Sequence, residues 1–217
     1  MTRLTPTDLK IRIALPKGRM ASRALEIFAD AGIPVPSDVN TRKLQISVEG
    51  HDIIYLMVKP QDVPVYVEYG TADVGVAGKD TILESDVDVY DALDLGFGKC
   101  RMVLAGPRGK TQESTSELPF FRLATKYPRI AERYFAAKGL PVEIIGLGGS
   151  VELACSCGLA DRIVDLVETG RTLAQNGLVE METLFHSSAR LIVNRASHKI
   201  RNEGVRDILE RLKGTRS

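Results

Sequence analysis

The sequence predicts an α/β fold of mixed, largely parallel sheet flanked by helices, and two observations predict it. Short apolar, β-branched runs alternate along the chain with amphipathic stretches of helical period, which is the pattern of parallel strands joined by crossover helices. The 217 residues, 44% of them hydrophobic and 26% charged, are enough for one domain or two small lobes with a buried core.

The first half of the chain predicts six strands and two helices. The helix over 20–31 ends where Gly32 and Pro34 stop it, and the helix over 60–69 tolerates Pro60 in its first turn. A turn-rich tetrapeptide at 49–52 separates two strands that should pair. The predicted strands are 11–15, 44–48, 53–58, 73–77, 87–95 and 101–105.

The second half begins after a loop over 106–119 that is rich in Gly, Ser, Thr, Pro and Glu. Helices are predicted over 128–138, from about Ser150, and over 197–213. The predicted strands are 121–125, 142–145, an apolar run from Ile163, 178–184 and 189–193.

Composition excludes several classes of function. The formal net charge of +1 predicts no general attraction to nucleic acid or to an anionic membrane. No apolar run is long enough for a signal peptide or a membrane span, and an odd count of three cysteines favours a reducing cytoplasm. Cys155 and Cys157 lack the spacing of a redox or zinc motif, so we expect a buried pair of small residues. The three histidines are scattered, so they predict neither a metal site nor a catalytic triad.

The most informative stretch runs from Ile163 to Leu173. An apolar run that contains Asp165 and ends at Glu168 is followed by Thr169, Gly170, Arg171 and Thr172. That order predicts a strand, a loop with exposed N–H groups, and a helix start, where both the amides and the helix dipole favour a phosphate. The two carboxylates could hold the hydroxyls of an attached sugar, so the stretch favours a phosphoribosyl site over an ordinary capped turn.

Three further motifs have both a functional and a structural interpretation. Lys17, Arg19 and Arg23 cluster at a helix start, where each cation is disfavoured by the helix macrodipole by about 0.3–1 kcal/mol. The functional interpretation is that an anion binds among them. The structural one is that the side chains point into water, which screens the penalty. The segment 146–152 is either a ligand loop or a simple loop with a capping box. In the segment 70–80, tight packing of glycines against a helix is the better default.

Taken together, these stretches resemble the ATP phosphoribosyltransferase family in its short form. They run in family order from about residue 11 to residue 197. The matching motifs are ALPKGR (14–19), PQDVPVYVEYG (60–70), DVGVAG (73–78), ATKYP (124–128), GSVE (149–152) and DLVETGRTL (165–173).

The resemblance implies the first step of histidine biosynthesis, in which N1 of ATP attacks C1′ of phosphoribosyl pyrophosphate and pyrophosphate leaves, with Mg²⁺ required. It also implies two lobes similar to a periplasmic binding protein, with the active site in the cleft between them. Lobe I would comprise residues 1–95 and 182–217, on the ATP side, and lobe II residues 96–181.

Site residues follow from the same resemblance, residue by residue. The donor's 5-phosphate would lie on Glu168, Thr169, Gly170, Arg171 and Thr172, with Asp165 on the ribose hydroxyls. Lys17 and Arg19 would face the pyrophosphate, and Glu152 the metal or the sugar. Arg42, Lys59, Asp94, Leu95 and Gly96 would approach ATP. Relatives often carry Arg where this chain has Lys59, and lysine cannot make the two-pronged contact of arginine. No metal ligand is predicted.

The resemblance also implies partners. The long form of the family has a further C-terminal domain that binds histidine, which we expect to be missing here. Short forms rely on a regulatory subunit resembling histidyl-tRNA synthetase, which implies a hetero-octamer and a homodimer when the chain is alone. Two rival interpretations are a two-lobed binding protein without chemistry and a phosphoribosyltransferase acting on another base.

Overall fold

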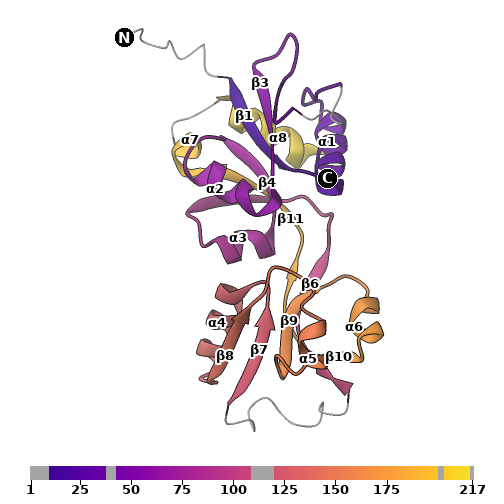
Figure 1. The fold of residues 1–217 in the computed structure, drawn as a ribbon. Coiled ribbons are helices and arrows are strands. Elements are labelled where there is room, and N and C mark those ends of the chain that lie inside the picture. Colours follow the sequence, from indigo (N-terminus) through magenta and orange to yellow (C-terminus); the bar gives the residue numbers. More distant parts are fainter. Residues whose placement is uncertain (1–9, 38–42, 109–119, 200–202, 216–217) are drawn as a thin grey trace. The chain divides into compact units, whose positions relative to one another are not determined.

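The computed structural model describes residues 10–37, 43–108, 120–199 and 203–215. The chain divides into two compact units, shown in Figure 1. Unit 1 comprises residues 1–98 and 188–217, and unit 2 comprises residues 99–187. The lobes predicted from the sequence change at residues 95 and 181. Residue 181 lies inside a strand, β10 (Leu178–Ser187), which pairs with β6 (Cys100–Pro107) and therefore belongs wholly to unit 2.

Unit 1 contains a six-stranded sheet in the order β2-β3-β1-β4-β11-β5. The pairs β1–β3 and β1–β4 are parallel, while β2, β11 and β5 pair antiparallel with their neighbours. The strands are β1 (Ile11–Pro16), β2 (Gln45–Ser47), β3 (Ile53–Val58), β4 (Val74–Gly78), β5 (Val89–Asp94) and β11 (Ala189–Asn194). The helices are α1 (Arg19–Asp30), the 3₁₀ turn η2 (Pro60–Asp62), α2 (Val63–Glu68), α3 (Lys79–Ser85), α7 (Arg195–Lys199) and α8 (Glu203–Gly214).

Helices cover both faces of this sheet. On one face, α1 and α8 present apolar residues at helical spacing, such as Ala24 and Phe28 of α1 and Ile208 of α8, which join one core cluster with the strands. On the other face, α2 packs Val63 and Val67 into a second cluster. The strands β1, β3, β4 and β11 are therefore largely buried on both sides and their sequences are mostly apolar, whereas the outer strands β2 and β5 are more exposed and carry polar residues.

Unit 2 contains a five-stranded sheet in the order β10-β6-β9-β7-β8. The pairs β7–β8 and β7–β9 are parallel, and β6 pairs antiparallel with both β9 and β10. The remaining strands and helices are β7 (Phe121–Thr125), α4 (Pro128–Ala137), β8 (Val142–Gly146), α5 (Leu153–Ser156), β9 (Arg162–Val167) and α6 (Arg171–Gln175).

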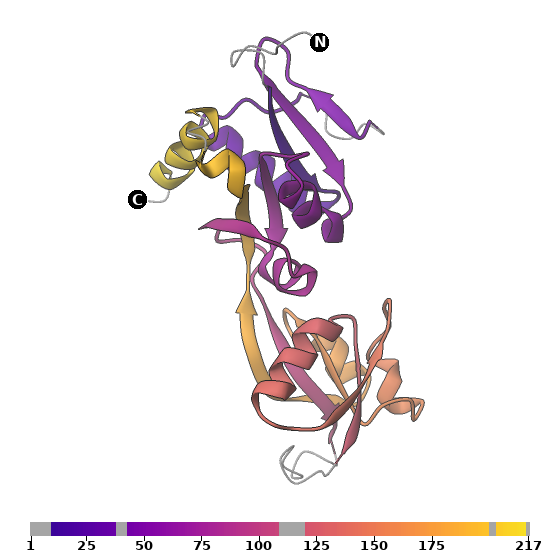
Figure 2. The ribbon, with the colours of Figure 1, turned by 90° about the vertical axis from the view of Figure 1, so that its left-hand side faces the viewer.

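The two faces of this sheet are also covered. Helix α4, seen crossing one face in Figure 2, buries Ile130 and Phe135 against Met102 and Leu123. Helices α5 and α6 cover the other face through Ala154 and Leu173, as Figure 1 shows. Alternation along β6 and β9 places Arg101 and Asp165 on the α5/α6 face, the same face as Val103 and Ile163.

The predicted α/β class with two mixed sheets is confirmed, and three details differ. The sheets are parallel only around β1 and β7, because β6, β10 and β11 return antiparallel beside them. Helix α3 (Lys79–Ser85) was not predicted, since seven residues between two strands show little helical period. The predicted helix over 197–213 corresponds to α7 and α8, and residues 200–202 lie outside the described residues, as do 109–119 of the predicted loop.

The cysteines also differ from expectation. The three cysteines form no disulfide with one another, and Cys155 is half-buried while Cys157 is exposed, because α5 ends at Ser156 and leaves Cys157 at its outer end. His51 and His186 are exposed. Within the ranges described above, no helix is long and apolar enough to cross a membrane.

Candidate functional site

In unit 2, three segments that follow parallel strands meet at one edge of the sheet. Thr125 is level with Gly146 of β8 and with Val164 of β9, so the carboxyl ends of β7, β8 and β9 lie together. Lys126, the residues 147–152 and the residues 168–172 follow these ends. Ligands of open α/β sheets bind at such an edge. The structure therefore brings together the predicted residues Glu152, Asp165 and Glu168–Thr172.

The loop 168–172 has the geometry of an anion seat. Gly170 takes a left-handed backbone (φ 77°) and precedes α6, a conformation that costs glycine little and other residues more. The first helical hydrogen bond of α6 is donated by the Ala174 amide to the Gly170 carbonyl at 3.1 Å. Because α6 has only five residues, its dipole is small. The exposed amides of the loop, more than the helix dipole, therefore attract a phosphate.

Asp165 lies in β9, three residues before Glu168 in the sequence, and is half-buried. Burial raises the pKa of its carboxyl group, and the charge of Glu152 raises it further, while the amide of Leu166, which donates to Asp165 Oδ1 at 2.8 Å, and the charge of Lys126 lower it. Glu152 and Lys126 are therefore electrostatic neighbours of Asp165. When ionised, a carboxylate is an acceptor only, so Asp165 can accept hydrogen bonds from sugar hydroxyls.

Two cations of this edge were missed by sequence reasoning. Lys126 follows β7 within the ATKYP motif and is exposed. Arg101 is the second residue of β6, and its Nη1 donates to the Glu168 carbonyl at 3.2 Å. Lys126 could have been found from its position after a parallel strand. Arg101 could not, because only the antiparallel pairing of β6 with β9, which sets Arg101 opposite Val167, brings it to the loop.

The glycine-rich segment before α5 behaves as an open loop. Ser150 takes a positive φ of 51°, and α5 has no side-chain hydrogen bond at its amino end, so the capping box considered for this segment is not formed. A Cβ added at Gly146, Gly148 or Gly149 would meet nothing within 4 Å. These glycines therefore leave open space beside Glu152 for a ligand.

In unit 1, Lys17, Arg19 and Lys59 lie at the carboxyl ends of β1 and β3. Pro16 pairs with Val58, and the Lys17 amide donates to the Val58 carbonyl at 2.9 Å, so Lys17 and Lys59 follow adjacent strands. All three side chains are exposed.

The start of α1 is open to an anion. Gly18, at φ 97°, gives no side-chain cap to this twelve-residue helix, and its first turn has no acidic residue. The first amide to turn inward is that of Ala21, which donates to the Gly18 carbonyl. An uncapped helix start beside Lys17 and Arg19 is electrostatically suited to an anion.

Asp94, Leu95 and Gly96 lie at the same edge of this sheet but far along it. Asp94 accepts hydrogen bonds from the Gly96 amide (2.8 Å) and from Ser188 Oγ (2.9 Å), and it forms an ion pair with Arg190 (3.0 Å). The side chain of Leu95 is only 2% exposed. A ligand at this segment would therefore contact mainly its backbone. Four strand spacings separate β3 from β5, which is roughly 19 Å at ~4.8 Å each. The structure does not bring Lys59 and Asp94 together, and Arg42 lies outside the described residues.

The carboxyl end of β4 lies between those two groups and carries residues not chosen from the sequence. Asp80 is 8% exposed and folds back over Gly78, where an added Cβ would lie 2.4 Å from Asp80 Oδ1. Lys79 follows Gly78 at the start of α3, and its amide donates to the Ser188 carbonyl. The sequence signal that could have found Lys79 and Asp80 is their position directly after Gly78, the last residue of a buried strand.

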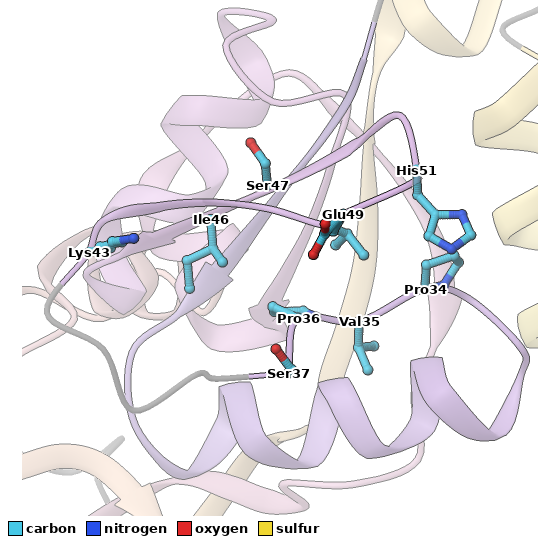
Figure 3. A pocket seen from close by; sticks show the side chains of 10 residues that line it. Pro34, Val35, Pro36, Ser37, Lys43, Ile46, Ser47, Glu49 and His51 are labelled. Carbon is cyan, nitrogen blue, oxygen red and sulfur yellow. The ribbon is translucent and has the colours of Figure 1, made fainter.

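A separate pocket of unit 1 lies over the segment that follows α1 and over the β2–β3 hairpin (Figure 3). Its cavity of about 500 Å³ is lined by polar and apolar side chains that include Lys43, Ile46, Glu49 and His51. None of the predicted site residues that the structure describes lines it.

Metal-binding capacity is limited. Across the described residues, no three His, Cys, Asp or Glu side chains gather into a group that could hold a metal ion. Asp165 and Glu152 form a carboxylate pair. Since Mg²⁺ prefers six oxygens and commonly keeps water and substrate phosphate oxygens, this pair fits a magnesium ion held mostly by the substrate and not one held by the protein alone.

Residues 59–214 match the family model HisG, ATP phosphoribosyltransferase. The ATP phosphoribosyltransferase of Caldanaerobacter subterraneus is 52% identical over 94% of this chain and 96% of its own, and that of Moorella thermoacetica is 47% identical over 94% and 92%.

Among solved structures, a chain of the ATP phosphoribosyl transferase (HisG:HisZ) complex from Thermotoga maritima matches with a TM-score of 0.81 and 36% identity, covering 94% of this chain and 97% of that one. Tv2483 bound to L-arginine shares the fold alone, at a TM-score of 0.59 and 13% identity over 97% and 86% of the two chains. The resemblance inferred from the motifs is thus confirmed, and the chain belongs to the ATP phosphoribosyltransferase family, which catalyses the first step of histidine biosynthesis.

Proposed function

We propose that the chain joins N1 of ATP to C1′ of phosphoribosyl pyrophosphate and releases pyrophosphate. The observation that carries this assignment of substrates is the loop 168–172, whose exposed amides lie beside a half-buried carboxylate at the carboxyl edge of the unit 2 sheet. A phosphate seat next to an acceptor of hydroxyl hydrogen bonds matches the two ends of a phosphoribosyl group.

Unit 2 binds the donor in this proposal. The amides of Thr169, Gly170 and Thr172 hold the 5-phosphate, and Asp165 accepts hydrogen bonds from the ribose hydroxyls. Those hydroxyls stabilise the charged carboxylate and so counter the effect of burial on its pKa. Glu152 offers a second carboxylate to the sugar or the metal.

Unit 1 supplies cations for the leaving group. Lys17 and Arg19, exposed at the uncapped start of α1, stabilise the charge that grows on pyrophosphate as its bond to C1′ breaks. Lys59 contacts one part of ATP and the backbone of residues 94–96 another, since roughly 19 Å separates their strands at ~4.8 Å per spacing. Arg42 is proposed to contact ATP as well. Adenine N1 is already nucleophilic, so positioning and charge stabilisation suffice without a strong base.

We propose that the reaction requires Mg²⁺. When bound to the pyrophosphate oxygens, Mg²⁺ neutralises part of the leaving-group charge. Glu152 and Asp165 are the side chains that would face it, and the remaining ligands are substrate oxygens and water.

We propose a regulatory partner as well. The matching Thermotoga maritima chain is part of a HisG:HisZ complex, so a HisZ-type subunit is the expected partner, with a hetero-octamer as the assembly, a homodimer for the chain alone, and the cytoplasm as the compartment. Size-exclusion chromatography with light scattering, with and without such a subunit, measures these assemblies.

An ultraviolet assay of product formation tests the reaction. Activity is expected with ATP, phosphoribosyl pyrophosphate and Mg²⁺, alone or with a HisZ-type subunit, and absorbance should not change when other bases replace ATP. Asp165→Asn should raise the donor KM while the ATP KM stays within about twofold. An unchanged donor KM in this variant removes Asp165 from the site, and turnover of another base overturns the substrate assignment.

A further inference from the structure

We propose that Arg101 is a positioning residue for the phosphoribosyl donor, which it serves by holding the Glu168 carbonyl so that the Thr169 amide faces the donor's phosphate. This inference rests on the proposed function of the loop 168–172 and adds a residue that contacts no substrate.

The contacts of Arg101 join three segments of unit 2. Its Nε and Nη2 donate to the carboxylate of Glu180 on β10, at 2.7 to 3.0 Å, and its Nη1 donates to the Glu168 carbonyl at 3.2 Å. Glu180 is held in turn by Thr183 Oγ1 at 2.7 Å. Both side chains of the ion pair are 29% exposed, so the pair is shielded more than an ordinary surface pair.

The geometry of one peptide bond links Arg101 to the phosphate seat. In a trans peptide the carbonyl and the following N–H point in opposite directions. Because Arg101 holds the Glu168 carbonyl on its own side, the Thr169 amide must point away from Arg101. The next residue, Gly170, then turns the chain through its positive φ into α6. Fixing this single peptide plane therefore orders the first amide of the loop before the donor arrives.

An arginine is needed for this arrangement. The planar guanidinium binds both carboxylate oxygens of Glu180 through its Nε and Nη2 edge and still has Nη1 for the carbonyl. A lysine offers three donors on one nitrogen atom and cannot reach both partners in a fixed plane. Arg101→Lys keeps the charge and removes the geometry, so it separates positioning from simple attraction.

Glu180 provides a second way to separate the two effects. Its carboxylate offsets the charge of Arg101, whose Nη2 would lie 4.0 Å from a Cβ at Gly170. Glu180→Gln leaves the site one charge more positive. If Arg101 acted by attraction, the donor would bind more tightly to this variant. If Arg101 acts by position, the donor binds more weakly because the guanidinium is no longer held in its plane.

The test measures donor binding and kinetics of the full chain, with Mg²⁺ and with its HisZ-type subunit where activity requires it. For Arg101→Lys we expect the Kd and KM of phosphoribosyl pyrophosphate to rise about tenfold, as for loss of one well-placed charge-assisted hydrogen bond, with the ATP KM within about twofold. Glu180→Gln should raise them about three- to tenfold. Donor-induced protection of residues 168–173 from hydrogen exchange should be weaker in both variants.

Lys138→Gln is the matched control. Lys138 forms a second ion pair with β10, to Glu182 at 2.5 Å, and no contact of Lys138 with the loop 168–172 is seen among the described residues. We expect its donor KM to match that of the unmodified chain. Circular dichroism confirms the fold of each variant, and Glu180→Gln stands as the test if Arg101→Lys does not fold.

A donor KM within twofold of the unmodified value in Arg101→Lys, or tighter donor binding in Glu180→Gln, overturns the inference. If those variants are neutral while Asp165→Asn raises the donor KM, only the role of Arg101 is lost. If the unmodified chain does not bind phosphoribosyl pyrophosphate, the proposed function and this inference are both lost.

Discussion

Gly75 offers a sharp test of how unit 1 is packed. It is the second residue of β4, on the face covered by α2, and an added Cβ would lie 2.7 Å from Val67 Cγ2 and 2.9 Å from Val63 Cγ1. Both valines are 0% exposed. Gly75→Ala therefore inserts one methyl group where two buried methyl groups already touch the backbone.

The size of the effect follows from the stiffness of those valines. Valine in a helix has one strongly preferred χ1 rotamer, and moving off a rotamer by about 30° costs of order 0.5–1.5 kcal/mol. Displacing both side chains, or shifting α2 away from the sheet, gives about 1–3 kcal/mol in total, the usual cost of overpacking a core. The cost should exceed the small gain that alanine brings through the unfolded chain.

Urea unfolding followed by circular dichroism measures this loss, since the chain has no tryptophan. Gly214→Ala is the control in the same unit, because Gly214 ends α8 with nothing within 4 Å of its added Cβ and alanine should leave stability unchanged or raise it by up to ~1 kcal/mol. Val67→Ala combined with Gly75→Ala should recover part of the loss through coupling. Equal stability of Gly75→Ala and the unmodified chain would refute this account of the contact.

Three further predictions concern the two candidate sites. Thr125 is fully buried, and its Oγ1 donates to the Val164 carbonyl at 2.7 Å and accepts from the Tyr127 amide at 2.9 Å. Thr125→Val should therefore lower the free energy of unfolding in urea by about 2 kcal/mol. A loss below about 0.5 kcal/mol would contradict the importance of these bonds. Burial first, and Glu152 second, raise the pKa of Asp165 above its unfolded value of 3.8, so the folded state holds more protons between the two pKa values and stability falls as pH rises through that window. Asp165→Asn should therefore be more stable than the unmodified chain at neutral pH, and unfolding curves should converge below the unfolded pKa; a gain that persists there would count against this origin. Arg19→Ala should lower kcat more than it weakens ATP binding, because charge grows on pyrophosphate in the transition state, and steady-state kinetics showing a change in the ATP KM alone would contradict that role.

Much of the fold could be predicted because its elements have strong local signals. The strand at 53–58 is a continuous apolar run and those at 121–125 and 189–193 are mostly apolar, and each lies within one residue of its predicted bounds. Helix α3 was missed because its seven residues between two strands show little helical period. The antiparallel return of β6, β10 and β11 was also missed, since a strand's own residues do not encode its direction.

The candidate site divides in the same way. The loop 168–172 was predictable because its turn residues are contiguous in the sequence. Arg101 was not, because it reaches the loop only through the pairing of β6 with β9, 67 residues apart in the chain at the Glu168 contact. The glycines at 70–80 illustrate a structural interpretation that held, since Gly75 packs against a helix as expected.

The place of β11 in its sheet sets the order in which a ribosome can complete the two units. All five strands of unit 2 lie within residues 99–187, whereas β11 (Ala189–Asn194) must insert between β4 and β5, which were synthesised about a hundred residues earlier. Until residue 194 emerges, the nascent amino-terminal half keeps the edge of β4 unpaired, and β5 has no neighbour to join. Unit 2 is thus able to complete its fold before unit 1. A nascent chain that stops before β11 exposes an unpaired edge of β4 that favours aggregation.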